Sequence, residues 1–119
     1  MRPILSMALM LTPLSAVCAE TFDHYKKADI EILAAQPLAS DTTRLVYQPL
    51  LESLFYCPGA VGERKDGREK ITLVRCSIHE RCAVDFAAKA VEHGFELVLP
   101  AAPRDIDLVF SDGEVRLAD

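Results

Sequence analysis

One segment constrains this chain more than any other, the apolar run near its N-terminus. Met1–Ala19 contains a single charged residue, Arg2, and an almost unbroken apolar stretch from Ile4 to Leu14. A short positive region, an apolar region of about 11 residues and a small-residue exit at Val17-Cys18-Ala19 are the plan of a secretory signal peptide. We therefore expect cleavage near Ala19 and one small mature domain over residues 20–119.

Two other roles for this segment are disfavoured. A transmembrane helix needs about 20 apolar residues, so we expect no span. Lipidation of Cys18 would make the chain a lipoprotein, but Val17 stands where bacterial lipoproteins usually have Gly, Ala or Ser. The sequence favours a soluble periplasmic or secreted protein.

Charge limits the partners of the mature domain. The full chain has 13 Lys+Arg and 18 Asp+Glu, a formal net charge of −5. Removing Met1–Ala19 takes away one positive charge, Arg2, which leaves a net charge of −6 on residues 20–119. An acidic domain is a poor match for nucleic acid or for an anionic membrane surface. Its field favours a basic protein partner.

Three cysteines remain after export to an oxidising compartment, where thiols pair. Asp66-Gly67 suits a two-residue hairpin turn in which both residues have positive φ. That turn places Cys57 opposite Cys76, within disulfide reach, and we predict a Cys57–Cys76 bond between the strands. Cys82 is then a free thiol, or the contact point of a homodimer, disulfide-linked or non-covalent.

A helix is predicted directly after this hairpin. Ser77 and Glu80 have the spacing of a capping box. Apolar residues recur at helical spacing from Ile78 to His93, and Gly94 is a typical residue at a helix end. We expect the helix Ile78 to His93 to pack on the sheet.

The C-terminal quarter predicts strands. Phe95–Leu99 is a short apolar run stopped by Pro100. A second hairpin is expected around Asp112-Gly113, with Phe110 opposite Val115 and Leu108 opposite Leu117.

The N-terminal half leaves alternatives open. Thr21–Ala35 has apolar residues at helical spacing. Thr42–Gln48 alternates like a strand, and Pro49 could start a helix after it, yet one helix over 42–56, bent at Pro49, fits nearly as well. The predicted class is α+β: an antiparallel sheet of four to five strands, the helix Ile78 to His93, and one or two N-terminal helices.

Few residues carry a chemical signal. Cys57, Cys76, His79 and Cys82 form a nominal zinc ligand set, and Cys82 with His79 a nominal thiol–imidazole pair. Oxidation of the cysteines and the apolar surroundings predicted for Cys82 argue against both. We predict no metal, no cofactor and no catalytic residue.

Three carboxylates and one imidazole are the candidate binding residues. Asp105 and Asp107 lie on one face of a predicted strand, and His79 and Glu80 lie in the first turn of the predicted helix. Solvated side chains are the simpler interpretation of the two aspartates, because acid–base chemistry needs a cleft and shifted pKa values.

One short segment resembles a known family. Cys76-Ser77-Ile78-His79-Glu80-Arg81-Cys82, a histidine between two cysteines directly after a strand, is similar to the inhibitory loop of periplasmic inhibitors of vertebrate lysozyme. The resemblance covers seven residues and implies an acidic protein that blocks a basic hydrolase through His79.

The sequence therefore predicts a small exported, non-enzymatic protein that binds another protein, such as an inhibitor, an immunity protein or a secretion accessory factor. The alternatives are the inhibitor-like loop with His79, and a metal or thiol protein that uses Cys57, Cys76, His79 and Cys82.

Overall fold

The computed structural model describes residues 23–118, and these residues are built almost entirely from β-strands. The predicted signal peptide and Cys18 lie outside them. The two helical segments within residues 23–118 are single 3-10 turns, η1 (Lys27–Asp29) and η2 (Pro103–Asp105). The strands are, in chain order, β1 (Asp23–His24), β2 (Ile30–Ala39), β3 (Thr42–Pro49), β4 (Phe55–Tyr56), β5 (Gly59–Lys65), β6 (Arg68–Ser77), β7 (Phe86–Ala87), β8 (Lys89–Val91), β9 (Gly94–Leu99), β10 (Ile106–Phe110) and β11 (Gly113–Arg116).

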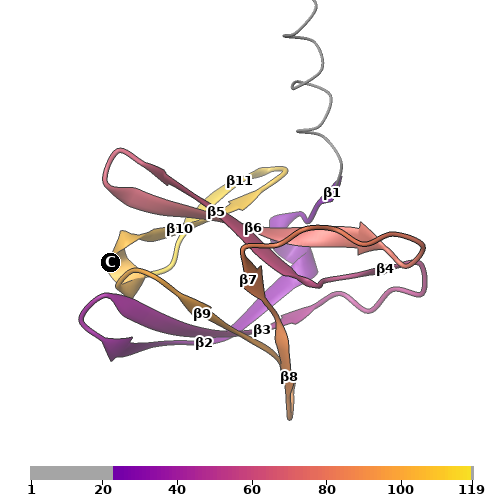
Figure 1. The fold of residues 1–119 in the computed structure, drawn as a ribbon, viewed down its shortest axis with the longest axis horizontal. Helices are drawn as coiled ribbons and strands as arrows, with labels where there is room; N and C mark the ends of the chain where they lie inside the picture. Colours follow the sequence, from indigo (N-terminus) through magenta and orange to yellow (C-terminus); the bar gives the residue numbers. More distant parts are fainter. Residues whose placement is uncertain (1–22, 119) are drawn as a thin grey trace, which may run out of the picture.

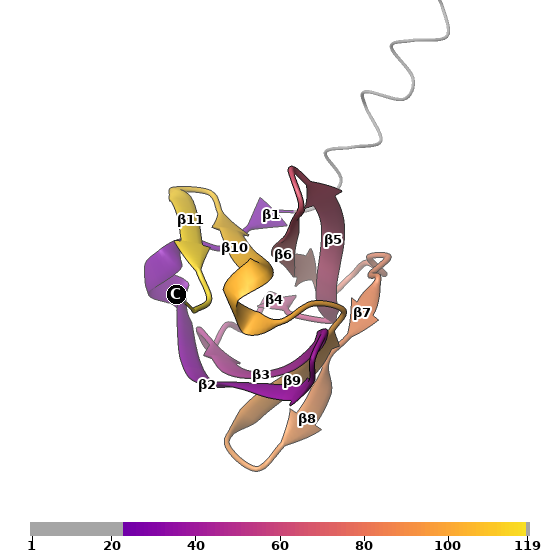
Figure 2. The ribbon, with the colours of Figure 1, turned by 90° about the vertical axis from the view of Figure 1, so that its left-hand side faces the viewer.

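These strands form two sheets that lie one over the other (Figures 1 and 2). The larger sheet has the order β11-β10-β6-β5-β7, with β1 and β4 also paired to β6, and the smaller sheet has the order β2-β3-β9-β8. All the pairs are antiparallel except β10 with β6. Buried side chains from both sheets form one core, which includes Tyr25, Leu45, Tyr47, Ile71, Leu73, Leu97, Leu99, Ile106 and Leu108. Among the described residues no helix is long and apolar enough to cross a membrane.

The predicted α+β class is wrong, and the helix Ile78 to His93 does not form. The capping-box residues make a turn instead: the His79 backbone N–H donates to Ser77 Oγ at 3.2 Å. β7 pairs with β5 in an extended conformation, so side chains two residues apart lie on the same face. Phe86 and Ala88 both pack on the core for this reason. The apolar residues between Ile78 and His93 have helical spacing, but short strands joined by loops partly bury some of the same residues.

From Asp23 to Tyr56 the described chain consists of strands, loops and the single turn η1, so within these residues there is no N-terminal helix, no bent helix over 42–56 and no helix after Pro49. The strand alternative for Thr42–Gln48 is confirmed by β3. Thr43, Leu45 and Tyr47 alternate into the core, and β3 is an inner strand between β2 and β9. Its β-branched and aromatic side chains fill the half-buried surface of a sheet well.

Both predicted hairpins form, but the strand register is predicted correctly only for the first. Asp66 and Gly67 have φ of 55° and 77°, and Glu63 faces Lys70 as predicted. Around the second turn Leu108 faces Val115, so this register differs from the predicted one by two residues. A shift of two leaves each side chain on its predicted face of the sheet.

The register of the first hairpin shifts by one residue before it reaches Cys57. Ala60 faces Leu73 in β5–β6, but Tyr56, rather than Cys57, faces Cys76 in β4–β6. Pro58 lacks an N–H for the ladder, so a break in the pairing here is physically reasonable. The structure accordingly replaces the predicted Cys57–Cys76 bond with Cys76–Cys82 and leaves Cys57 as a buried thiol.

Candidate functional site

The most distinctive surface lies at one end of the molecule, where the β3–β4 connection meets the segment that follows β6 (Figure 1). The two segments are joined by a hydrogen bond from the Ile78 N–H to the Leu54 carbonyl at 3.0 Å. Five large apolar side chains are exposed here, and we call them the leucine surface: Leu50, Leu51, Leu54, Tyr56 and Ile78. Leu51 is 87% exposed and Leu54 61%.

Several contacts hold the leucine surface in place. Glu52, in the middle of the β3–β4 connection, accepts hydrogen bonds from Arg75 on β6 at 2.5 to 3.2 Å. The Arg75 guanidinium also lies 3.7 Å from the centre of the Phe55 ring. At the start of the connection the Leu50 N–H donates to the Asp29 carbonyl at 2.7 Å. The exposed leucines are therefore presented by a segment anchored to β6 and to the turn η1.

A small hollow of about 160 Å³ opens beside these leucines. It is lined by Tyr25, Gln48, Pro49, Leu50, Leu51, Glu52, Phe55, Tyr56, Cys57 and Phe95. Most of the lining is aromatic or aliphatic. A hollow of this kind suits one apolar side chain of a partner, which is how an interface anchor is usually seated.

Cys57, one of the residues that line the hollow, is buried and contacts two buried tyrosines, Tyr25 and Tyr47. Tyr47 Oη and Cys57 Sγ are 3.4 Å apart, and Cys57 Sγ is 3.4 Å from the Gly59 carbonyl. Burial raises the pKa of Cys57, and burial also raises the pKa values of Tyr25 and Tyr47. A buried thiol whose pKa is raised is a poor nucleophile.

The Cys76–Cys82 bond closes a loop next to the leucine surface. His79, Glu80 and Arg81 are exposed within this loop, and Tyr56 Oη donates to the Glu80 carbonyl at 3.2 Å. Since Cys82 is in this bond, it is neither the predicted free thiol nor available for the predicted disulfide-linked dimer.

The four-residue zinc set that the alternative hypothesis needs is not assembled. Among the described residues the cluster of metal-type ligands is Cys76, Glu80 and Cys82, and it includes neither Cys57 nor His79.

The two candidate aspartates separate in the structure. Asp105 is half-buried in η2, whereas Asp107 is buried on β10. Asp107 accepts two hydrogen bonds from Arg68 and one from Lys70, each at 2.8 Å. The hydrogen bonds from Arg68 hold the pKa of Asp107 well below its usual range. Asp107 is thus an internal ion-pair partner, and both of its carboxylate oxygens already accept hydrogen bonds from Arg68 or Lys70.

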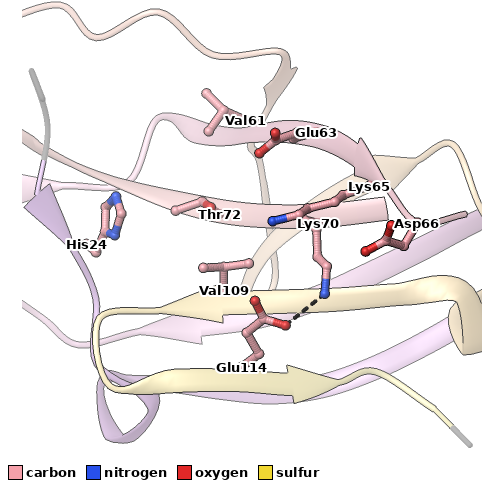
Figure 3. Close-up of a pocket in the computed structure, with 10 residues that line it drawn as sticks. His24, Val61, Glu63, Lys65, Asp66, Lys70, Thr72, Val109 and Glu114 are labelled. Atoms are coloured by element: carbon pink, nitrogen blue, oxygen red, sulfur yellow. Dashed lines mark hydrogen bonds and ion pairs between the residues drawn. The ribbon is translucent and has the colours of Figure 1, made fainter. Parts of the chain in front are cut away.

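A larger, open groove of about 580 Å³ lies on the outer face of the larger sheet (Figure 3). Lys70 projects across it and bonds to Glu114 at 2.8 Å, and Val61, Thr72 and Val109 also line it. Since both signs of charge are present and Lys70 is already paired, the groove lacks the concentrated positive charge that recognises phosphate.

Sequence reasoning missed Leu50, Leu51 and Leu54. The sequence places them in a possible helix that starts at Pro49, in which leucines would be buried; the absence of strand alternation after Pro49 is the one signal for an irregular segment. Comparisons with protein-family models, curated proteins and solved structures found no match to this chain.

Proposed function

We propose that this protein is an exported, non-enzymatic protein that binds another protein through the leucine surface. The observation that carries this proposal is the exposure of Leu51 and Leu54 on a connection anchored by Glu52 and Arg75. A contiguous exposed apolar patch commonly marks an interaction site. An anchored loop loses little conformational freedom on binding, so more of its contact energy is kept as affinity.

Charge and shape support a description of the partner. The net charge of −6 on residues 20–119 would steer a basic protein toward this domain. An apolar side chain of that partner would enter the hollow beside Leu50 and Leu51. Inhibitors, immunity proteins and secretion accessory factors are the classes that act in this way without chemistry of their own.

The test is capture of a partner by matched variants. Leu51→Asp should abolish recovery of the specific partner from an envelope or target-cell extract. Leu38→Asp is the control, because Leu38 is 56% exposed on β2 and lies outside the leucine surface. Binding of the purified partner is then measured for each variant. Equal affinity for Leu51→Asp, Leu54→Asp and the unchanged protein would contradict the proposal.

A second candidate function rests on the disulfide-closed loop. His79 is exposed between Cys76 and Cys82, in a loop that their disulfide closes, and this is the segment that resembles the inhibitory loop of lysozyme inhibitors. The inhibitory role predicts that the protein slows cell-wall hydrolysis by a vertebrate lysozyme and that His79→Ala removes this effect. His93→Ala is the control, since His93 is exposed in the β8–β9 turn. Full lysozyme activity in the presence of the protein would eliminate this candidate.

A further inference from the structure

Three metal-type ligand atoms meet at the base of the disulfide-closed loop. The sulfurs of Cys76 and Cys82 and a carboxylate oxygen of Glu80 all lie within 4.8 Å of one another. Cys76 Sγ also lies 3.7 Å from the Glu80 carbonyl, so the backbone of the loop holds Glu80 above the sulfurs. While the disulfide is intact its sulfurs are not thiolates and do not ligate zinc.

We propose that reduction of Cys76–Cys82 turns this cluster into a zinc site. The two thiolates and the Glu80 carboxylate are ligand types that zinc accepts, at about 2.3 Å for sulfur and about 2.0–2.2 Å for oxygen. Ligand atoms around one tetrahedral ion at those lengths are roughly 3.5–4 Å apart. After reduction the two sulfurs therefore move apart from bonding distance, and the Glu80 oxygen, already within 4.8 Å of both, needs only a small movement. Water fills the fourth position from the solvent side.

The site is open to both a reductant and the ion. A shallow hollow lined by Glu80, Arg81, Cys82 and Ala83 lies on the solvent side of the disulfide. Cys82 is only partly buried there, whereas Cys76 is 1% exposed. Attack therefore occurs at the Cys82 sulfur.

The electron and proton balance is simple when the reductant is a protein or small-molecule dithiol. Its first thiolate bonds to Cys82 Sγ, the Cys76–Cys82 bond breaks, and Cys76 leaves as a thiolate that takes a proton. The second thiol of the reductant, as its thiolate, then displaces Cys82, which leaves as a thiolate and takes the second proton, and the reductant closes its own disulfide. Two electrons have passed to this protein, which now has two thiols. Zinc binding releases their two protons.

The consequence is a loop that is closed in either redox state. Oxidised protein holds residues 76–82 by a covalent bond, and reduced protein holds them by the metal. Ile78 belongs both to this loop and to the leucine surface, and its N–H is bonded to the Leu54 carbonyl. Metal binding would therefore keep this part of the leucine surface in place when the disulfide is reduced. This inference does not depend on the proposed binding function, because metal binding is measured on the protein alone.

The test uses the full chain with Cys18→Ser and Cys57→Ser, so that only the two loop cysteines remain. The protein is reduced with a phosphine, freed of reductant without air, and titrated with Co²⁺ and then with Zn²⁺. We expect near-ultraviolet thiolate-to-cobalt absorption at one ion per chain, displacement of Co²⁺ by Zn²⁺, and no such absorption in the oxidised protein.

Matched variants assign the third ligand. Glu80→Gln should weaken metal affinity about tenfold or more, since even supporting groups around a metal contribute that much. Glu63→Gln removes an exposed carboxylate from β5 and should leave the affinity unchanged. Lack of thiolate-to-cobalt absorption in the reduced protein would overturn the proposal, and so would equal affinity in Glu80→Gln. The same titration with Cys57 restored guards against misfolding, and binding that depends on Cys57 would also overturn it.

Discussion

Glu52 and Arg75 are 23 residues apart in sequence and form a hydrogen-bonded ion pair that joins the β3–β4 connection to β6. Both side chains are largely buried, with 14% of Glu52 and 25% of Arg75 exposed. Together with the backbone hydrogen bonds of Leu50 and Leu54, this pair holds the connection that carries the exposed leucines.

Neutralising Glu52 should therefore loosen the leucine surface. We expect Glu52→Gln to lower the free energy of unfolding by about 1 kcal/mol, since one charge-assisted interaction at a partly solvated site is weakened. The Ile78 amide, which bonds to the Leu54 carbonyl, should exchange with solvent faster. Glu63→Gln is the control for the general effect of removing a carboxylate. Unchanged exchange at Ile78 would show that the ion pair does not order the connection.

Cys57 should be the unreactive thiol of the domain. Because burial raises its pKa, the folded protein should not be alkylated near neutral pH. Unfolding without a reductant should expose one reactive thiol within residues 20–119 of each molecule. Peptide mapping should find the label on Cys57. A label on Cys82 would mean that the Cys76–Cys82 bond is absent.

Asp107 should be a source of acid sensitivity. Its pKa is about 3.9 in an unfolded chain and is lower in the folded state, so its stabilising contribution is complete at neutral pH. That contribution falls as the pH drops below about 4 and through the folded pKa. We expect Asp107→Asn to lower the free energy of unfolding by about 2 kcal/mol at pH 7 and by progressively less in acid.

Asp105→Asn is the matched control for this pH dependence. Asp105 lies two residues away in η2, and its side chain forms no ion pair with any residue of the described range 23–118. Denaturant unfolding at several pH values should show only a small effect for Asp105→Asn. A loss of stability at pH 7 as large as that of Asp107→Asn would contradict the assignment.

The sequence predicted the structure correctly where a short motif fixes the backbone dihedral angles. Asp66-Gly67 requires a tight turn, and the register of β5 with β6 follows from it. Spacing was uninformative between Ile78 and His93, because Phe86 lies one helical turn from Cys82 but also alternates with Ala88, and only pairing with β5 decides between the two patterns. Long-range pairing of this kind is not encoded in any short window.

The candidate site was harder to predict than the hairpin. A one-residue shift between Tyr56 and Ala60 moved Cys57 out of register with Cys76. Pro58 marks where the pairing can break, but residue spacing does not give the size of the shift. The position of the exposed leucines depends on Arg75 of β6, which contacts Glu52 and Phe55 in the β3–β4 region. The sequence does not show that Arg75 contacts these two residues, which are 20 or more positions away. Charged residues were easy to list, but their partners depended on the topology, as with Asp107 and Arg68.

Removal of the disulfide distinguishes the observed cysteine pairing from the predicted one. A bond that closes a loop with a sequence separation of 6 should contribute about 2 kcal/mol through the entropy of the unfolded chain. Cys82→Ser should therefore lower the free energy of unfolding of the oxidised protein by about that amount, and a reductant should then have little further effect. Cys57→Ser should leave the effect of the reductant intact, because Cys57 is outside the bond. The reverse pattern, in which Cys57→Ser abolishes the effect of reductant and Cys82→Ser does not, would restore the Cys57–Cys76 pairing.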